Sequence, residues 1–394
     1  MKVLFANGFL IDGAGGYLER GGLLVEDQRI AAVGKEVSDR LGDADAVIDL
    51  EGRTLMPGMI DTHCHPGAGD YDPDREKDSV GLAALHTYEA LERTLRAGFT
   101  TVRSAGARDY VDVDARDAIA CGIIPGPRVI ASGRGVTMTG GHGVGSAAEV
   151  DGVDAVRREA RVQIKRGADS IKIFGISGGV ASGTNEDAEQ FTVEEIRAAV
   201  EESRKAGKLN QTHAIGLPGI KNAVEAGVNS IDHGIFLDEE VCEKMARRGI
   251  FLVPTFGPFY YYAVRRVAEP WRWQRALRLM EPHKASFRLA MEKKVPIAFG
   301  CDCGAPSRFK NGENALEYQL MVEAGMGSMD AIVAGARNAA RLLRLDHLIG
   351  TLEPGKLADI VVIERNPLED ITLLQSRVAM VMREGRVYLN KLGA

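Results

Sequence analysis

Short apolar runs, each followed by a helical stretch, recur through the middle of the chain. Helical stretches such as "GLAALHTYEALERTLRAG" and "TVEEIRAAVEESRKAG" place their apolar residues three or four positions apart, as amphipathic helices do. The second stretch opens with Thr192 as a helix N-cap and with Glu195 three residues later. The strand candidates span residues 55–60, 100–103, 128–131, 170–174, 209–213, 230–233, 251–255 and 296–300.

This alternation of strands and helices predicts an α/β fold. Eight strand–helix units over roughly 290 residues favour a (β/α)8 TIM barrel. An open, doubly wound parallel sheet is the alternative, because the count of eight depends on short strands.

The two ends of the chain show a different pattern, of β-prone runs broken by turns. "GGLLVEDQRIAAVG" has a D-Q turn between two such runs, and "VAMVMREGRVYLN" has an E-G turn. We therefore expect residues 1–55 and 350–394 to form one small sheet domain, and residues 56–349 to form the barrel.

Composition restricts the classes of partner. The chain has 394 residues, of which 45% are hydrophobic and 26% are charged, as in ordinary globular proteins. A net charge of −6, without any Lys/Arg block, gives no reason to expect nucleic acid. No run has membrane-spanning length, and the five cysteines form no disulfide framework, so we expect a cytoplasmic protein without a membrane partner.

Residues capable of chemistry gather at the ends of the predicted strands, where a barrel forms its active site. Any one histidine or lysine there has an ordinary structural explanation, but their joint placement at one rim predicts a metal site. Four imidazoles and a carboxylate suit Zn²⁺ or a similar divalent ion. The predicted ligands are His63, His65, Lys172, His213, His233 and Asp302.

Lys172 determines the expected number of metal ions. A protonated ammonium would be repelled by cations, whereas reaction with CO₂ gives a carbamate (N6-carboxylysine) whose oxygens bridge two ions. The sequence therefore predicts a binuclear site.

Several segments resemble the amidohydrolase superfamily, nearest to its Xaa-Pro, Xaa-Arg and Xaa-Lys dipeptidases and its imidazolonepropionase-like proteins. The resemblance covers nearly the whole chain through "ANGFLIDG", "IDLEGRTLMPGMIDTHCH", "MTGGHG", "IKIFGISGG", "THA", "IDHG", "ARNAARLL" and "GTLEPGKLADIVVI". It implies a β-sandwich built from both termini beside the barrel, and a closed homo-oligomer.

The resemblance also implies a role for each ligand. His63 and His65 would hold one metal, and His213 and His233 the other. Carboxylated Lys172 would bridge the two ions, while Asp302 would bind the first metal and move protons.

Two positions depart from the family pattern. Where relatives commonly read Gly-Thr-Asp-Ala/Ser-Gly, this chain has Gly300-Cys301-Asp302-Cys303-Gly304. We expect both cysteines to pack as small apolar residues, with capture of a stray ion or oxidation as alternatives. Ile235 stands where dipeptidase relatives often have a tyrosine that helps hold the substrate carboxylate, so the exact substrate stays open.

The predicted reaction is hydrolysis of an amide bond by a metal-bridging hydroxide, with a dipeptide or an N-acyl amino acid as the small-molecule substrate. Hydrolysis of a cyclic amide, a lactone or a carbamate is the alternative, and a non-enzymatic scaffold is disfavoured because no ligand is missing. His142, in the loop "TMTGGHGVG", is predicted to stabilise the oxyanion or to grip the substrate.

The pattern does not assign one role to the aromatic segment or to its arginines, and it indicates a structural role for the remaining histidines. The aromatic segment 256–273 predicts either a lid or an oligomer contact. Its arginines, Arg265, Arg266 and Arg272, either pair a substrate carboxylate or are solvated. We expect the remaining histidines to be structural, namely His86, His283 and His347.

Overall fold

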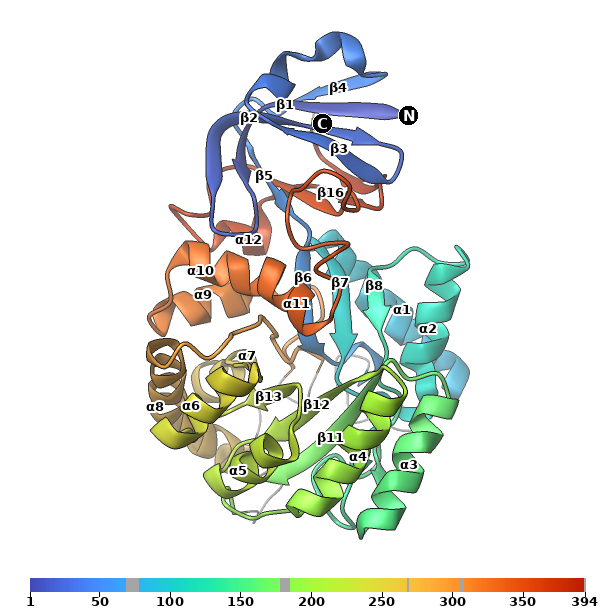
Figure 1. The fold of residues 1–394 in the computed structure, drawn as a ribbon, viewed down its shortest axis with the longest axis vertical. Helices are drawn as coiled ribbons and strands as arrows, with labels where there is room; N and C mark the ends of the chain where they lie inside the picture. Colours follow the sequence, from blue (N-terminus) through green and yellow to red (C-terminus); the bar gives the residue numbers. More distant parts are fainter. Residues whose placement is uncertain (69–77, 178–184, 268, 305–307, 393–394) are drawn as a thin grey trace.

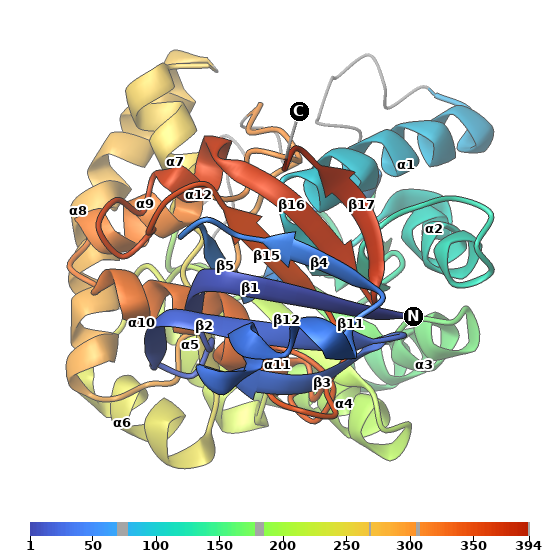
Figure 2. The ribbon, with the colours of Figure 1, turned by 90° about the horizontal axis from the view of Figure 1, so that it is seen from above.

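The computed structural model describes residues 1–68, 78–177, 185–267, 269–304 and 308–392. A β domain lies at one end, and the remaining chain forms a body of parallel strands surrounded by helices (Figure 1). Seen from the side of the β domain, its strands lie over the middle of the ring of helices (Figure 2).

The β domain combines strands from both ends of the chain in one mixed sheet of order β17-β16-β15-β5-β1-β2-β3, with β4 beside β1. The D-Q and E-G turns predicted from the sequence connect β2 to β3 and β16 to β17. The strands of this sheet are β1 (Lys2–Ile11), β2 (Tyr17–Glu26), β3 (Arg29–Gly34), β4 (Ala46–Asp49), β5 (Thr54–Pro57), β15 (Ile360–Ile363), β16 (Val378–Arg383) and β17 (Arg386–Asn390).

The resemblance implies a β-sandwich from both termini, and the strands of this domain are hydrogen-bonded as one continuous sheet. The reason is β1, which pairs with β2 on one side and with both β4 and β5 on the other. One long strand therefore joins halves that would otherwise be separate.

Alternate residues of β15 face two different cores. Ile360 and Val362 pack in the core of the β domain, whereas Val361 and Ile363 belong to the large core of the helical body. Because side chains of a strand alternate between its faces, this one strand attaches the β domain to the rest of the molecule.

The body contains nine short strands in two parallel sheets, of order β6-β7-β8 and β10-β9-β11-β12-β13-β14, among the described residues. The expected alternation of parallel strands and helices is therefore present, although these regular strands do not make one closed barrel. Their bounds are β6 (Met59–Cys64), β7 (Phe99–Ser104), β8 (Arg128–Ile130), β9 (Val136–Thr137), β10 (Ala148–Glu149), β11 (Ser170–Ser177), β12 (Leu209–Ala214), β13 (Ser230–His233) and β14 (Phe251–Val253).

Two of the eight predicted strands differ from the structure. The run 55–60 is divided at Gly58, so that Leu55 pairs with β15 in the β domain and Met59 begins β6 beside β7. The run 296–300 is not a regular strand, and its ladder is reduced to an isolated bridge between Ile297 and Leu252.

Backbone hydrogen bonds nevertheless connect the two parallel sheets at both junctions. On one side, Ala131 O accepts from the amides of Asp169 and Ser170. On the other side, the segment 296–303 bonds to β14 and to β6, with Thr62 N to Phe299 O at 3.0 Å and Asp302 N to His63 O at 2.7 Å. Gly300 permits this approach, because a Cβ there would lie 2.9 Å from the Cβ of His63.

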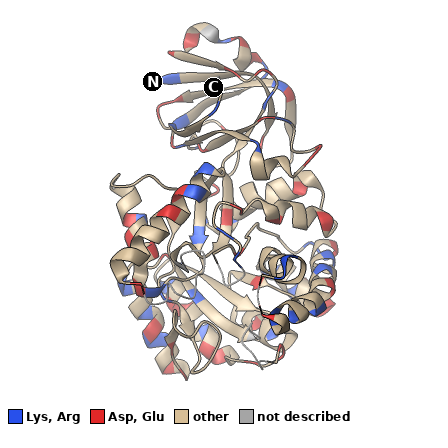
Figure 3. Ribbon diagram, turned by 180° about the vertical axis from the view of Figure 1, so that it is seen from behind, with Lys and Arg blue, Asp and Glu red and all other residues tan. Residues whose placement is uncertain are grey.

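Helices cover the outside of the parallel strands, and Lys/Arg and Asp/Glu are intermixed along them (Figure 3). Helix α4 begins at the predicted capping box of Thr192 and Glu195. None of the described helices combines the length and the apolar character needed to cross a bilayer. The helices are α1 (Val80–Arg96), α2 (Val111–Ala120), α3 (Val153–Lys165), α4 (Val193–Lys205), α5 (Leu217–Ala226), α6 (Glu239–Arg248), α7 (Gly257–Tyr260), α8 (Pro270–Glu292), α9 (Leu316–Glu323), α10 (Ser328–Val333), α11 (Ala339–Leu342) and α12 (Leu373–Ser376).

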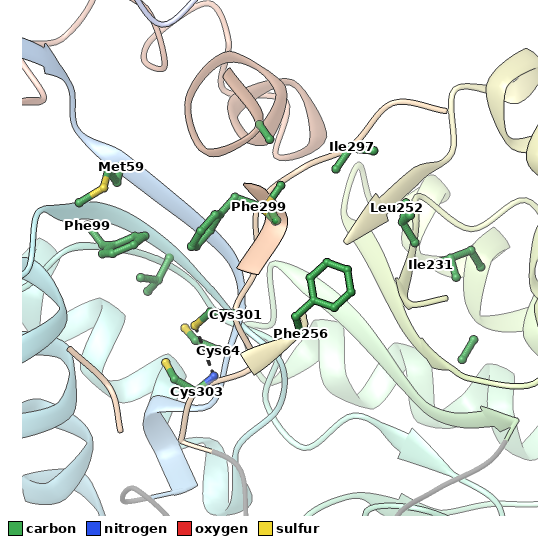
Figure 4. Packing of buried hydrophobic residues seen from close by; sticks show 14 of the residues in the cluster. Met59, Cys64, Phe99, Ile231, Leu252, Phe256, Ile297, Phe299, Cys301 and Cys303 are labelled. Atoms are coloured by element: carbon green, nitrogen blue, oxygen red, sulfur yellow. Dashed lines mark hydrogen bonds between the residues drawn. The ribbon is translucent and has the colours of Figure 1, made fainter. Parts of the chain in front are cut away.

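The interior between the strands is packed with apolar side chains below the strand ends (Figure 4). The rings of Phe99 and Phe299 lie 5.5 Å apart, and Phe299 packs on Tyr318 at 4.2 Å. This layer fills the space beneath the polar residues at the carboxyl ends of the strands.

Candidate metal centre

Five histidines form an arc at the carboxyl ends of the parallel strands. Ring centroids are 4.1 Å apart for His142 and His213, 4.3 Å for His213 and His233, 5.2 Å for His233 and His63, and 5.4 Å for His63 and His65. They come from the ends of β6, β12 and β13 and from the loop after β9, so residues distant in sequence meet at one rim. The arc brings together every histidine that the sequence predicted for the site.

Asp302 closes one end of this arc. Its Oδ1 lies 3.2 Å from His65 Nε2 and 3.5 Å from His63 Nε2. Burial alone would raise the pKa of Asp302, but His63 and His65 outweigh it and hold that pKa well below its ordinary value. The backbone of Asp302 has a φ of 57°, a left-handed conformation that is uncommon for residues other than glycine and concentrates at functional sites.

The arc contains buried polar atoms without hydrogen-bond partners among the described residues. They are Nε2 of His213, Nε2 of His233 and Oδ1 of Asp302. One donor atom from each of His63, His233 and Asp302 lies within 4.8 Å of the others. Because buried polar groups in proteins are normally satisfied, these atoms fit the ligands of a divalent cation.

A buried ion pair of Asp232 and Arg103 orients His63. The Nδ1 of His63 lies 2.7 Å from Asp232 Oδ2, and the fully buried Arg103 lies 3.6 Å from the same carboxylate. Burial would raise the pKa of Asp232, but Arg103 and His63 outweigh it and lower that pKa. A carboxylate on one ring nitrogen leaves the other free to bind a metal.

Asp232 and Arg103 were not among the residues predicted for the site, although the sequence carries a signal for both. Each is a charged residue inside an otherwise apolar strand, in "SIDHG" and "TTVRS". Charges in such positions are rarely buried without a partner.

His233 is held from two sides. Its Nδ1 lies 2.6 Å from Thr255 Oγ1, and its carbonyl oxygen accepts from His283 Nε2 at 3.0 Å. His283 was expected to be structural, and it holds the backbone of this predicted ligand. His86 instead faces Asp78 at 3.5 Å, away from the arc.

Lys172 lies within β11, and its side chain is only 1% exposed. Its Nζ stands 5.1 Å from the centroid of the Phe174 ring. Burial lowers the pKa of the Lys172 ammonium to about 8, against the opposing charges of Asp232 and Asp302. The neutral fraction of this amine near physiological pH is therefore larger than for an exposed lysine, although still the minor form, and only the neutral amine is nucleophilic.

His142 is half-buried at the open side of the arc. Its ring stacks on His213, and its backbone amide donates to Gln190 Oε1 at 3.1 Å. Burial and then the charge of Lys172 lower the pKa of His142 to about 4, so the ring is neutral at pH 7.

One face of α8 borders the site. From this face His283 contacts His233, and Ser286 Oγ donates to Ile235 O at 2.7 Å. Arg275 lies two helical turns before His283, is 7% exposed, and pairs with Glu186 at 2.9 Å through its Nε. Its charge also contributes to the low pKa of His142, so Arg275 is the buried cation of this border.

The aromatic segment is helical rather than a long loop. Arg266 stacks on Trp273, and Arg272 stacks on Trp271, with guanidinium–centroid distances of 5.0 Å in both pairs. Arg265 likewise lies over Tyr260 at 5.9 Å. The arginines considered from the sequence thus pack on surface aromatics, whereas Arg275 is buried beside the site. Whether the segment serves as a lid or an oligomer contact stays a prediction.

The chain matches known proteins over nearly all of its length. A sequence model of the amidohydrolase family matches residues 54–388. Ochratoxinase of Aspergillus niger is 32% identical over 429 residues, covering 98% of this chain and 86% of that protein. Imidazolonepropionase of Geobacillus thermodenitrificans is 24% identical, covering 95% of this chain and 91% of that protein. A crystal structure of a Xaa-Pro dipeptidase with methionine bound in the active site is 34% identical, has a TM-score of 0.89, and covers 99% of this chain and 100% of that one.

Proposed function

Because the chain belongs to the amidohydrolase family and is a hydrolase acting on amide carbon–nitrogen bonds, we propose that it cleaves dipeptides or N-acyl amino acids at a binuclear metal centre. Members of this superfamily generally use divalent metals. The observation that carries the proposal is the convergence of His63, His233 and Asp302, whose ligand atoms lie within 4.8 Å of one another. Beside them, the buried Nε2 atoms of His213 and His233 have no hydrogen-bond partner among the described residues.

The residues present fit two divalent ions, of which zinc suits the donors best. His63, His65 and Asp302 would hold one ion, and His213 and His233 the other. Lys172 as N6-carboxylysine would bridge them, and its low pKa supports reaction of the neutral amine with CO₂. When bound, the two ions would polarise the substrate carbonyl and make hydroxide available near neutral pH.

Asp302 would transfer the proton, and His142 would stabilise the oxyanion. Asp302 is ionised at neutral pH, so it accepts the proton of the attacking water and returns it to the departing amine. His142 is neutral, so it stabilises the oxyanion by donating a hydrogen bond rather than by carrying a charge.

Arg275 supports a substrate with a free carboxylate. Dipeptidase relatives often hold the substrate carboxylate with a tyrosine at the position of Ile235. In this chain, Arg275 offers a buried guanidinium at the same border of the site. Guanidinium–carboxylate pairing is strong and directional, and Glu186 fixes the arginine through its Nε.

We also propose that the parallel strands close into one barrel beside the β domain. The hydrogen bonds around Ala131 and along 296–303 support a closed (β/α)8 barrel within the predicted range 56–349. Met56 and Pro57 pair with β15, so they belong to the β domain together with residues 1–55 and 350–394. A homo-oligomeric state and a cytoplasmic location stay predictions of the sequence.

The test is a substrate screen with the zinc-loaded full chain. Libraries of Xaa-Pro, Xaa-Arg and Xaa-Phe dipeptides and of N-acyl amino acids are scored by released amine, with chelator-treated enzyme as the control. We expect zinc-dependent turnover of one of these classes. Turnover confined to lactones, cyclic amides or carbamates would favour the alternative hydrolase, and turnover unaffected by chelation would contradict the metal mechanism.

A further inference from the structure

A second group of buried donor atoms lies beside the imidazole arc. We call it the thiol–carboxylate cluster, and it consists of Asp61, Cys64, Cys301 and Cys303, each at most 1% exposed. Figure 4 shows the three cysteines converging from β6 and from the segment after Phe299. The sequence analysis expected the cysteines of Gly300–Gly304 to pack as small apolar residues, and their complete burial agrees with that.

Their polar contacts go beyond apolar packing. Cys301 Sγ donates to Asp61 Oδ2 at 2.8 Å, and Cys303 Sγ donates to Asn311 Oδ1 at 3.3 Å. Asn314 Nδ2 donates to Asp61 Oδ2 at 2.7 Å. The two asparagines therefore fix the directions of the carboxylate and of one thiol.

The donor atoms have the spacing of a metal site. One ligand atom from each of Asp61, Cys301 and Cys303 lies within 4.8 Å of the others. In a tetrahedral site with metal–sulfur bonds of about 2.3 Å, the donors lie roughly 3.5–4 Å apart.

We propose that the thiol–carboxylate cluster is a separate site for a thiophilic cation of the Cu⁺, Zn²⁺ and Cd²⁺ class. Cys301, Cys303 and Asp61 supply three ligands, while the neighbouring Cys64 thiol donates to Arg103 O at 3.7 Å. Sulfur donors select soft cations, whereas the nitrogen and oxygen donors of the imidazole arc suit borderline ones. On binding, each coordinating thiol exchanges its proton for a metal–sulfur bond, and no oxidation or reduction occurs.

The two sites share their supporting backbone. Asp61 Oδ1 accepts from the amide of His63 at 2.9 Å, and Cys301 and Cys303 flank Asp302 in sequence. A cation bound at the cluster would therefore be connected through the backbone to His63 and Asp302, two predicted ligands of the arc. The cluster exists in the structure whether or not the proposed hydrolase reaction is correct.

The test adds Cd²⁺ to the zinc-loaded full chain and measures bound metal together with thiolate-to-cadmium charge-transfer absorption in the ultraviolet. We expect one further equivalent of cadmium with this absorption, because cadmium exchanged into the nitrogen and oxygen site gives none. The Cys301→Ser/Cys303→Ser variant should lose the absorption. Cys242→Ser, which removes a buried thiol far from the cluster, and Cys121→Ser, which removes an exposed one, should keep it.

X-ray absorption at the cadmium edge makes the test independent of how well a variant folds, because it counts the sulfur neighbours in the parent chain. We expect at least two sulfur neighbours for the added ion. Absence of the charge-transfer absorption, the same absorption in Cys301→Ser/Cys303→Ser, or a cadmium shell of oxygen and nitrogen alone would overturn the proposal.

Discussion

The imidazole arc and the thiol–carboxylate cluster share two chain segments, β6 and the segment 296–303, yet they differ in how their donor atoms are satisfied. Each contains three donors within 4.8 Å of one another. In the arc, Nε2 of His213 and Nε2 of His233 have no hydrogen-bond partner among the described residues, whereas in the cluster Asp61 bonds to Cys301 and to Asn314. Burial is common to both, so it is the unsatisfied donors that distinguish the candidate catalytic centre.

The carboxylates of Asp302 and Asp61 also differ, in the direction in which their pKa values are shifted. Burial would raise the pKa of both, but His63 and His65 bring that of Asp302 well below its ordinary value. The pKa of Asp61 stays raised because burial outweighs its hydrogen bonds. Asp302 is therefore an anion ready to bind a cation and to accept a proton, while burial makes Asp61 easier to protonate than an exposed aspartate.

The largest expected effect comes from replacing these carboxylates one at a time. Asp302→Asn removes the proposed proton acceptor, so kcat should fall by about 10³-fold, a typical contribution of general acid–base catalysis. Asp61→Asn is the matched control and should change kcat less than about tenfold, because it touches no reacting atom. Equal losses in the two variants, or an Asp302→Asn enzyme within a few-fold of the parent, would contradict the distinction.

The second largest effect concerns the carboxylate behind His63. Asp232→Asn should weaken metal binding by about 10–100-fold, because the carboxylate orients the imidazole and raises its basicity. Competition with a chelator measures the affinity. Asp112→Asn is the control, since Asp112 is a buried carboxylate that binds the amides of Ser132 and Gly133 instead. A comparable loss of metal affinity in that control would mean that general destabilisation is the cause.

A smaller effect is expected at the border of the substrate site. Arg275→Met should raise KM about tenfold for substrates with a free carboxylate, because a charge-assisted hydrogen bond contributes about 1.5–3 kcal/mol. The corresponding carboxamides should be unaffected. Arg278→Met on the same helix, where the side chain is 73% exposed, should leave both KM values unchanged. An equal rise for acids and amides would exclude carboxylate recognition by Arg275.

The smallest effect is a pH dependence of stability from His283. Burial lowers the pKa of His283 to about 4, below the unfolded value of 6.5, so the unfolded chain takes up the proton first as the pH falls. Stability is therefore lost on acidification, and between pH 6.5 and 5.5 the loss amounts to about 1 kcal/mol. Chemical unfolding at the two pH values should show this loss in the parent, reduced in His283→Gln but not in the exposed control His347→Gln. An undiminished loss in His283→Gln would assign the acid sensitivity to other groups.

The arc could be predicted from the sequence because parallel strands bring their carboxyl ends to one rim. His63, His213 and His233 all end or nearly end apolar runs, so their convergence followed from the alternation of strands and helices alone. The capping box at Thr192 could also be predicted from the sequence, because it depends on residues only three positions apart.

Contacts between distant elements could not be predicted in this way. Asp232 reaches His63 across 169 positions, and the contact of His283 with His233 depends on how α8 packs against the end of β13. The run 296–300 reads as a strand in isolation, but its hydrogen bonds run to β14 and β6 without a regular ladder. Tertiary packing decides such features, and local pattern does not encode it.

An anomalous-difference map from crystals of the zinc-loaded full chain, recorded at the zinc edge, would locate the metal ions directly. We expect two peaks within the arc, one bonded to His63 and His65, the other to His213 and His233, with density for a carboxylated Lys172 between them. A single peak distant from Lys172, or none among these imidazoles, would contradict the proposed binuclear centre.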